Sequence, residues 1–85
     1  MTSPDQQFPD LPLGIYRHYK GKEYRLLGIA RHSETLEPHV IYQALYDDDE
    51  FGNAALWVRP YSLFVETVET EVGKLNRFEL LKSEK

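Results

Sequence analysis

Short runs of apolar residues alternate with polar ones along most of the chain, and these runs are rich in Tyr, Ile, Val, Leu and Phe. Alternation with β-branched and aromatic residues predicts β-strands, because successive side chains of a strand point to opposite faces. No stretch of ten or more residues keeps the 3.6-residue period of an amphipathic helix. The pattern predicts strands over residues 14–19, 23–31, 39–47, 55–59, 65–71 and 76–81.

Glycine and proline mark the connections between these strands. Gly21 lies in a predicted hairpin turn over 20–22, and Gly73 lies in a second turn over 72–75. Pro38 ends a predicted loop over 33–38, because proline has no amide hydrogen to donate to a strand ladder. Pro60 blocks the strand before it and suits the first turn of a helix, so residues 60–64 are predicted to form a single 3₁₀ turn.

Five or six short antiparallel strands with one such turn predict an all-β fold, a small closed or half-closed barrel of SH3-like type. An OB-like barrel is the alternative, although it ordinarily carries a helix that the sequence pattern lacks. Pro4, Pro9 and Pro12 predict a flexible leader over residues 1–13. The domain is expected to span residues 14–81, with a polar tail over 82–85.

Alternation sorts the strand side chains into two sets on opposite faces. The aliphatic set is the expected core, and the second set combines aromatic rings with polar tips. The second set is expected either to bind a ligand or to be core whose polar atoms find backbone partners. Along residues 23–32, Tyr24 and His32 fall on one face and Ile29 falls on the other. The aliphatic set comprises Ile15, Leu27, Ile29, Ile41, Leu45, Leu56 and Val58, and the aromatic–polar set comprises Tyr16, His18, His32, Tyr42, Tyr46, Trp57 and Arg59.

Composition and charge narrow the class of protein. The 85 residues suffice for one small domain, and the absence of cysteine excludes disulfides and Cys-based metal sites. No run approaches the about 18 apolar residues that a membrane-spanning helix needs, so a cytoplasmic protein without a membrane partner is expected. Residues 17–32 carry five Lys or Arg against one Glu, whereas residues 33–71 carry one Arg against nine acids. We expect the two stretches to lie on adjacent strands and to neutralise each other across the sheet, which argues against general nucleic-acid binding and leaves room for a local anionic ligand.

Arg59 is the residue whose role the charge pattern leaves most open. It is the only Lys or Arg between His32 and Lys74, and the following proline holds it extended. One interpretation is an ion pair with Glu66 or Asp47. The other is a bidentate clamp on a carboxylate or a phosphate.

The segment His32-Ser33-Glu34 offers a second candidate site. His32 could act as a general base that Glu34 orients, or the segment could be a strand end followed by local loop hydrogen bonds. The downstream Pro-Cys-x-x-Cys of zinc deaminases is absent. The three histidines do not follow any recurrent metal-ligand spacing, so no metal and no cofactor are expected.

Several motifs are similar to those of one protein family. They are the run Gly14-Ile15-Tyr16-Arg17-His18-Tyr19-Lys20-Gly21 with Tyr24, the run 30–37 that contains His-Ser-Glu-Thr, Val40-Ile41-Tyr42, Leu45-Tyr46, and Trp57-Val58-Arg59-Pro60 with Phe64. Together they resemble the bacterial domain-of-unknown-function family numbered 1653, over residues 14 to about 66. The resemblance implies an SH3-like small barrel in a short bacterial protein and implies no activity. The family's polar and aromatic positions correspond to Tyr16, His18, Lys20, Tyr24, His32, Glu34, Tyr42, Trp57 and Arg59.

These observations favour a non-catalytic module that binds a small anionic or peptide-like ligand, with Arg59 as the clamp and Trp57 and Tyr42 as a stacking floor. A His/Glu-dependent hydrolase or isomerase is the first alternative. A nucleic-acid module is the second, using Arg17, Lys20, Lys22, Arg25 and Arg31. A monomer or a weak homodimer is expected. The candidate ligand-binding residues are Tyr16, His18, Tyr24, His32, Glu34, Tyr42, Trp57 and Arg59.

Overall fold

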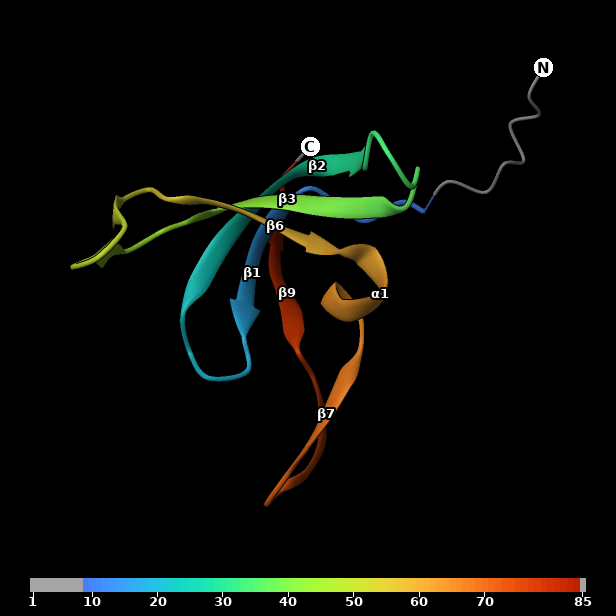
Figure 1. Ribbon diagram of the computed structural model, residues 1–85. Helices are drawn as coiled ribbons and strands as arrows, with labels where there is room; N and C mark the ends of the chain where they lie inside the picture. Colours follow the sequence, from blue (N-terminus) through green and yellow to red (C-terminus); the bar gives the residue numbers. More distant parts are fainter. Residues whose placement is uncertain (1–8, 85) are drawn as a thin grey trace.

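The computed structural model describes residues 9–84, and a five-stranded antiparallel sheet is its main element (Figure 1). The strand order is β6–β3–β2–β1–β9. The all-β prediction is therefore confirmed. The strands are β1 Gly14–His18, β2 Glu23–Arg31, β3 Pro38–Ala44, β6 Leu56–Pro60 and β9 Phe78–Ser83.

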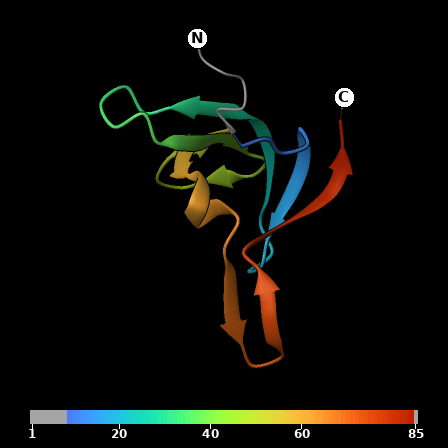
Figure 2. The ribbon, with the colours of Figure 1, turned by 90° about the vertical axis from the view of Figure 1, so that its right-hand side faces the viewer.

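Two small hairpins and one helical turn complete the fold. The hairpin of β4 (Asp47–Asp48) with β5 (Gly52–Asn53) connects β3 to β6, and that of β7 (Thr67–Thr70) with β8 (Gly73–Asn76) precedes β9. Both views show the β7–β8 hairpin projecting away from the main sheet (Figures 1 and 2). Within residues 9–84, no helix is long and apolar enough to cross a membrane.

Two local predictions after residue 59 are wrong. The turn after Pro60 is a short α-helix, α1 (Tyr61–Phe64), because the amide of Val65 donates to the carbonyl of Tyr61 four residues earlier. The last two predicted strands also do not pair with each other. Instead β7 pairs with β8, and β9 pairs with β1, so the chain returns to the far edge of the main sheet.

The sheet is curled, and side chains rather than backbone bonds connect its two edges. Strands β6 and β9 lie at opposite ends of the strand order and do not pair, so the sheet is not a closed barrel. Nevertheless the Phe78 ring from β9 lies 5.7 Å from the Arg59 guanidinium of β6. Phe78 also stacks on Phe64 of α1, with ring centroids 4.1 Å apart. The SH3-like label stays a prediction.

A β-bulge in β2 changes which residues share a face. The register with β3 skips one residue, because Leu26 lies opposite Tyr42 whereas Gly28 lies opposite Ile41. A bulge places two residues of one strand opposite one residue of its partner, which reverses the alternation beyond it. Ile29 therefore lies on the same face as Leu26, whereas strict alternation predicts opposite faces.

The core lies on the aromatic face, and the prediction of an aliphatic core is wrong. Leu56 and Val58 are 65% and 59% exposed, and Leu27 and Leu45 are exposed as well. The single helical turn can cover only one face of the five-stranded sheet. Phe64 of α1 and Phe78 pack on the face that carries the aromatic residues. The aromatic rings are therefore the buried set. The buried core residues are Tyr16, Leu26, Val40, Tyr42, Ala44, Phe64 and Phe78.

Segments at both ends of the described chain contact the sheet. The Tyr16 hydroxyl donates to the Pro12 carbonyl at 2.7 Å, and Leu11 packs against the core. Strand β9 continues to Ser83, two residues past the expected domain end at 81, and the Glu84 amide donates to the Leu13 carbonyl. Residues 1–8 of the expected leader and Lys85 lie outside the described residues.

The basic residues of β1 and β2 form ion pairs with the C-terminal strand. Arg17 pairs with Glu79 at 3.3 Å, and Arg25 pairs with Glu84 at 3.1 Å. The prediction that the acidic stretch over 33–71 neutralises them is wrong for these two residues. Instead the carboxylates come from Glu79 of β9, which lies next to β1 in the sheet, and from Glu84, which directly follows that strand.

Candidate functional site

Six of the eight candidate residues lie on the inner face of the curled sheet, and all of these except Trp57 gather around Phe78. Strands β1, β2, β3 and β6 each contribute at least one of them, and the Phe78 ring lies among them. The ring centroid of Phe78 lies 4.1 Å from that of Phe64 and 5.0 to 5.8 Å from those of His18, Tyr24 and Tyr42. We call this group the inner cluster, and it comprises Tyr16, His18, Tyr24, Tyr42 and Arg59 together with Phe64 and Phe78.

Arg59 is the cation of the inner cluster. Its Nε donates to the Tyr42 hydroxyl at 3.4 Å, and its guanidinium lies over the face of Phe78. No carboxylate among residues 9–84 forms an ion pair with it. Of the two expected partners, Asp47 does not pair with it and Glu66 pairs with Arg77 instead. A half-buried guanidinium held by a hydroxyl and a ring keeps donors available for an anion.

His18 lies at the edge of the same cluster. Its Nδ1 accepts the Lys20 amide at 3.1 Å, so the neutral ring carries its proton on Nε2. Burial lowers the pKa of His18, and the charges of Arg77, Arg59 and Lys20 lower it further. The three cations therefore create a positive potential at this imidazole.

One further tyrosine, Tyr46, extends the cluster toward Lys22 through Tyr24. The hydroxyls of Tyr24 and Tyr46 are 2.7 Å apart and share a hydrogen bond. Burial and this bond raise the pKa of Tyr24 well above its usual range. The Lys22 ammonium lies 4.4 Å from the centroid of the Tyr46 ring. Lys22 therefore places a further cation beside the cluster.

Trp57 lies on the same face of β6 as Arg59, where it packs against the core and contacts Phe51 of the acidic hairpin. It lies opposite Tyr42 in the β3–β6 register, and its ring meets Phe51 edge-on at 5.1 Å. Its Nε1 is buried and has no hydrogen-bond partner within residues 9–84. Tyr42 is only 5% exposed. Tyr42 is therefore too buried to form the expected stacking floor with the half-buried Trp57, and it offers its hydroxyl to Arg59 instead.

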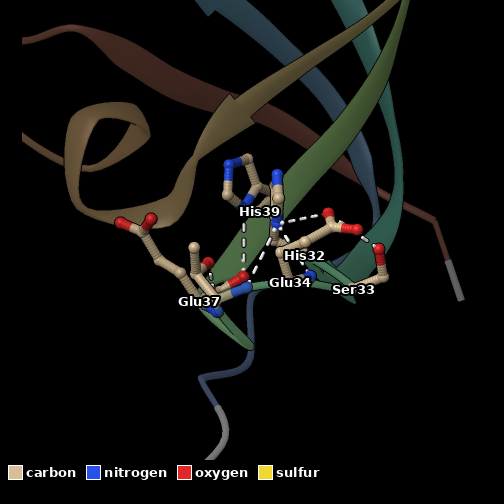
Figure 3. Close-up of polar contacts among 6 residues, drawn as sticks. His32, Ser33, Glu34, Glu37 and His39 are labelled. Carbon is tan, nitrogen blue, oxygen red and sulfur yellow. Dashed lines mark hydrogen bonds and ion pairs between the residues drawn. The ribbon is translucent and has the colours of Figure 1, made fainter.

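The remaining two candidates, His32 and Glu34, lie apart from the inner cluster in the loop between β2 and β3 (Figure 3). His32 Nδ1 accepts the amides of Glu34 and Thr35 at 3.1 and 3.3 Å. A nitrogen that accepts these amides cannot also carry a proton toward the Glu34 carboxylate, which lies 3.5 Å away. The arrangement is the local loop bonding that the sequence left as an alternative, and it gives a Glu-oriented base no support.

His39 faces His32 across this loop. Their ring centroids are 5.4 Å apart, and His39 Nδ1 bonds to the Glu37 carbonyl at 3.0 Å (Figure 3). In the part of the chain from residue 9 to 84, no three His, Asp or Glu side chains are placed to hold a metal ion. His18 lies with Phe78 rather than with these two rings.

Three important neighbours of Arg59 and His18 were not among the predicted site residues. Phe64 and Phe78 form the centre of the cluster, and Arg77 adds a cation beside His18. The alternation of strand 76–81 contains Phe78, but nothing in the sequence shows that this strand pairs with β1. The contact depends on that long-range pairing.

The fold and the inner cluster define a small, all-β domain with an aromatic core and a cationic edge. The family model of the "protein of unknown function (DUF1653)" matches residues 14–80, and the chain belongs to this family. A crystal structure of a DUF1653 protein from Bordetella bronchiseptica is similar, with a TM-score of 0.79 and 36% sequence identity. The match covers 92% of this chain and 96% of that one. No curated protein matches the chain.

Proposed function

We propose that this protein is a non-catalytic domain that binds a small anion, a carboxylate or a phosphate group, at Arg59 and His18. The observation that carries this proposal is the half-buried Arg59 guanidinium, which no carboxylate among residues 9–84 neutralises. Arg77 already pairs with Glu66, so Arg59 is the better donor of the two. The Tyr42 hydroxyl and the Phe78 ring restrict its orientation before any ligand arrives, which lowers the entropy cost of binding.

His18 would add a neutral donor beside the charged one. With Nδ1 occupied by the Lys20 amide, its Nε2–H is the group available to an anion oxygen. An anion bound here would reverse the field that lowers the pKa of His18. Binding is therefore expected to raise that pKa and to strengthen as the pH falls.

NMR titration of the three histidines tests the proposal, because His32 in the β2–β3 loop and His39 at the start of β3 lie apart from His18 and serve as internal controls. Inorganic phosphate, pyrophosphate, citrate and acetate are the probes. One of them is expected to raise the pKa of His18 and to leave the resonances of the other two in place. If all four anions move the three histidines alike or not at all, the proposal is wrong.

Arg59→Gln provides the second arm of the experiment. Losing a charge-assisted bond costs about 1.5–3 kcal/mol, so affinity for the probe should fall about 10- to 150-fold. Arg25→Gln is the matched control, since Arg25 forms an ion pair with Glu84 and lies outside the cluster. Equal weakening by both variants would indicate a diffuse charge effect and would contradict a clamp at Arg59.

A further inference from the structure

Strand β6 is an exposed edge of the main sheet, and the hydrogen-bond pattern determines which of its groups point outward. The Ala44 amide donates to the Ala55 carbonyl at 2.8 Å, so Ala44 and Ala55 form a hydrogen-bonded pair. Such pairs recur at every second residue, which makes Tyr42 with Trp57 the next one. The amides and carbonyls of Leu56 and Val58 therefore point away from β3.

The side chains of these two residues are also open. Both are exposed aliphatic residues, and they lie on the outer face of the sheet opposite Gln43 and Ile41. An edge that offers unpaired backbone groups beside exposed aliphatic side chains is a template for another strand. Pro60 ends this edge because it has no amide hydrogen, and Ala54 begins it with a left-handed φ of 59°. The usable edge is thus limited to Leu56–Val58.

From this edge we infer that two copies of the chain pair antiparallel through β6, with Leu56 of each copy opposite Val58 of the other. Leu56 and Val58 have the same hydrogen-bond orientation, so this register forms four backbone bonds around a twofold axis at Trp57. A shift of two residues in one direction places Val58 opposite the left-handed Ala54. The opposite shift places Leu56 opposite Pro60, which cannot donate.

Charge favours the antiparallel arrangement of two identical strands. The acidic segment Asp47–Glu50 precedes β6, and Arg59 lies near the end of the strand. In an antiparallel pair the beginning of one strand lies beside the end of the other, so each acidic hairpin approaches the Arg59 end of its partner. The outer side chains of Leu56 and Val58 are neutral, so self-pairing brings no like charges together there. The edge is therefore complementary in charge to the same edge of a second copy.

Sedimentation and light scattering across protein concentration test the pairing. The chain is expected to shift from monomer to dimer between about 10 µM and 1 mM, as small interfaces do. A Leu56→Lys/Val58→Lys variant places two pairs of lysines opposite each other and should raise the dissociation constant about tenfold or more. A Leu56→Glu/Val58→Lys variant places Glu opposite Lys twice and should restore most of the affinity. Circular dichroism checks that each variant folds.

Val72→Lys is the matched control, because Val72 is 81% exposed in the turn of the β7–β8 hairpin, away from β6. It should leave dimerisation unchanged. Amide exchange at Leu56 and Val58 should slow as concentration rises, whereas the Trp57 amide bonds to β3 in the monomer as well. If the wild-type chain stays monomeric at all concentrations, the inference is wrong, and a strand of another protein becomes the candidate partner of this edge. Equal loss of dimer in both double variants would overturn the register and the inference with it.

Discussion

Phe78 is expected to connect the two edges of the sheet, so its replacement should destabilise the fold more than any exposed ring. It is 7% exposed and contacts four other aromatic rings: Phe64, Tyr42, Tyr24 and His18. Truncating a buried phenylalanine to alanine costs about 3–5 kcal/mol. The stacked and edge-on pairs add about 0.5–1.5 kcal/mol each, which places the expected cost for Phe78→Ala at the upper end of that range.

A loss of this size is comparable to the whole stability of a small domain, which is about 0.05–0.15 kcal/mol per residue. Phe78→Leu is therefore the more informative variant, because it keeps most of the apolar volume and removes only the ring contacts. We expect it to lower the free energy of unfolding by about 1–2 kcal/mol and the Tm by about 5–15 °C. Urea unfolding followed by circular dichroism and by the fluorescence of the single tryptophan measures both.

The control for Phe78 is Phe51→Leu, in the β4–β5 hairpin. Phe51 is 53% exposed, and among residues 9–84 the one aromatic ring it contacts is Trp57, edge-on. Its replacement should cost less than about 1 kcal/mol. If Phe78→Leu destabilises the domain no more than Phe51→Leu, the closure of the sheet by this ring is refuted.

Two further predictions concern a glycine and a histidine. Gly14 has a φ of 151°, and a Cβ there would lie 2.1 Å from the Lys82 carbonyl oxygen. Gly14→Ala should therefore lower the free energy of unfolding, measured by thermal unfolding, by about 1–3 kcal/mol or more. Gly28→Ala should not, because the space around Gly28 is open. His18 has a lowered pKa, so the unfolded chain binds its proton more readily, and stability should fall as pH drops below about 6.5. His18→Asn should flatten this slope in urea unfolding, and His39→Asn should keep it.

The strands of the main sheet could be predicted from the sequence because their alternation and turn residues are local signals. Strand β2 has the predicted bounds, and β1, β3 and β6 differ from prediction by a few residues. The partner of β9 could not be predicted, since its pairing with β1 joins residues at least 60 positions apart. Nor could alternation alone decide which face is covered. That choice depends on where α1 and Phe78 pack.

The candidate site was predictable as far as the bulge in β2. Alternation groups Tyr16 with His18, and Trp57 with Arg59, and the structure keeps those groupings. Alternation also predicts that His32 shares a face with Tyr24. This prediction is wrong, because the skipped residue between Leu26 and Gly28 reverses the faces beyond it. His32 consequently lies in the β2–β3 loop, where its ring is next to that of His39 from β3.

Different residues of the inner cluster contribute to stability and to the positive potential, so the two contributions can be measured separately. The rings of Tyr42 and Phe78 are core, so replacing either changes the fold and the position of Arg59 together. Arg59 and His18 lie where this core meets solvent, and their polar atoms contribute to the potential more than to packing. Variants that change only the guanidinium or the imidazole should therefore alter anion affinity while retaining most of the stability. Core variants should lose stability and affinity in proportion, because the same rings that hold the sheet together also orient the cation.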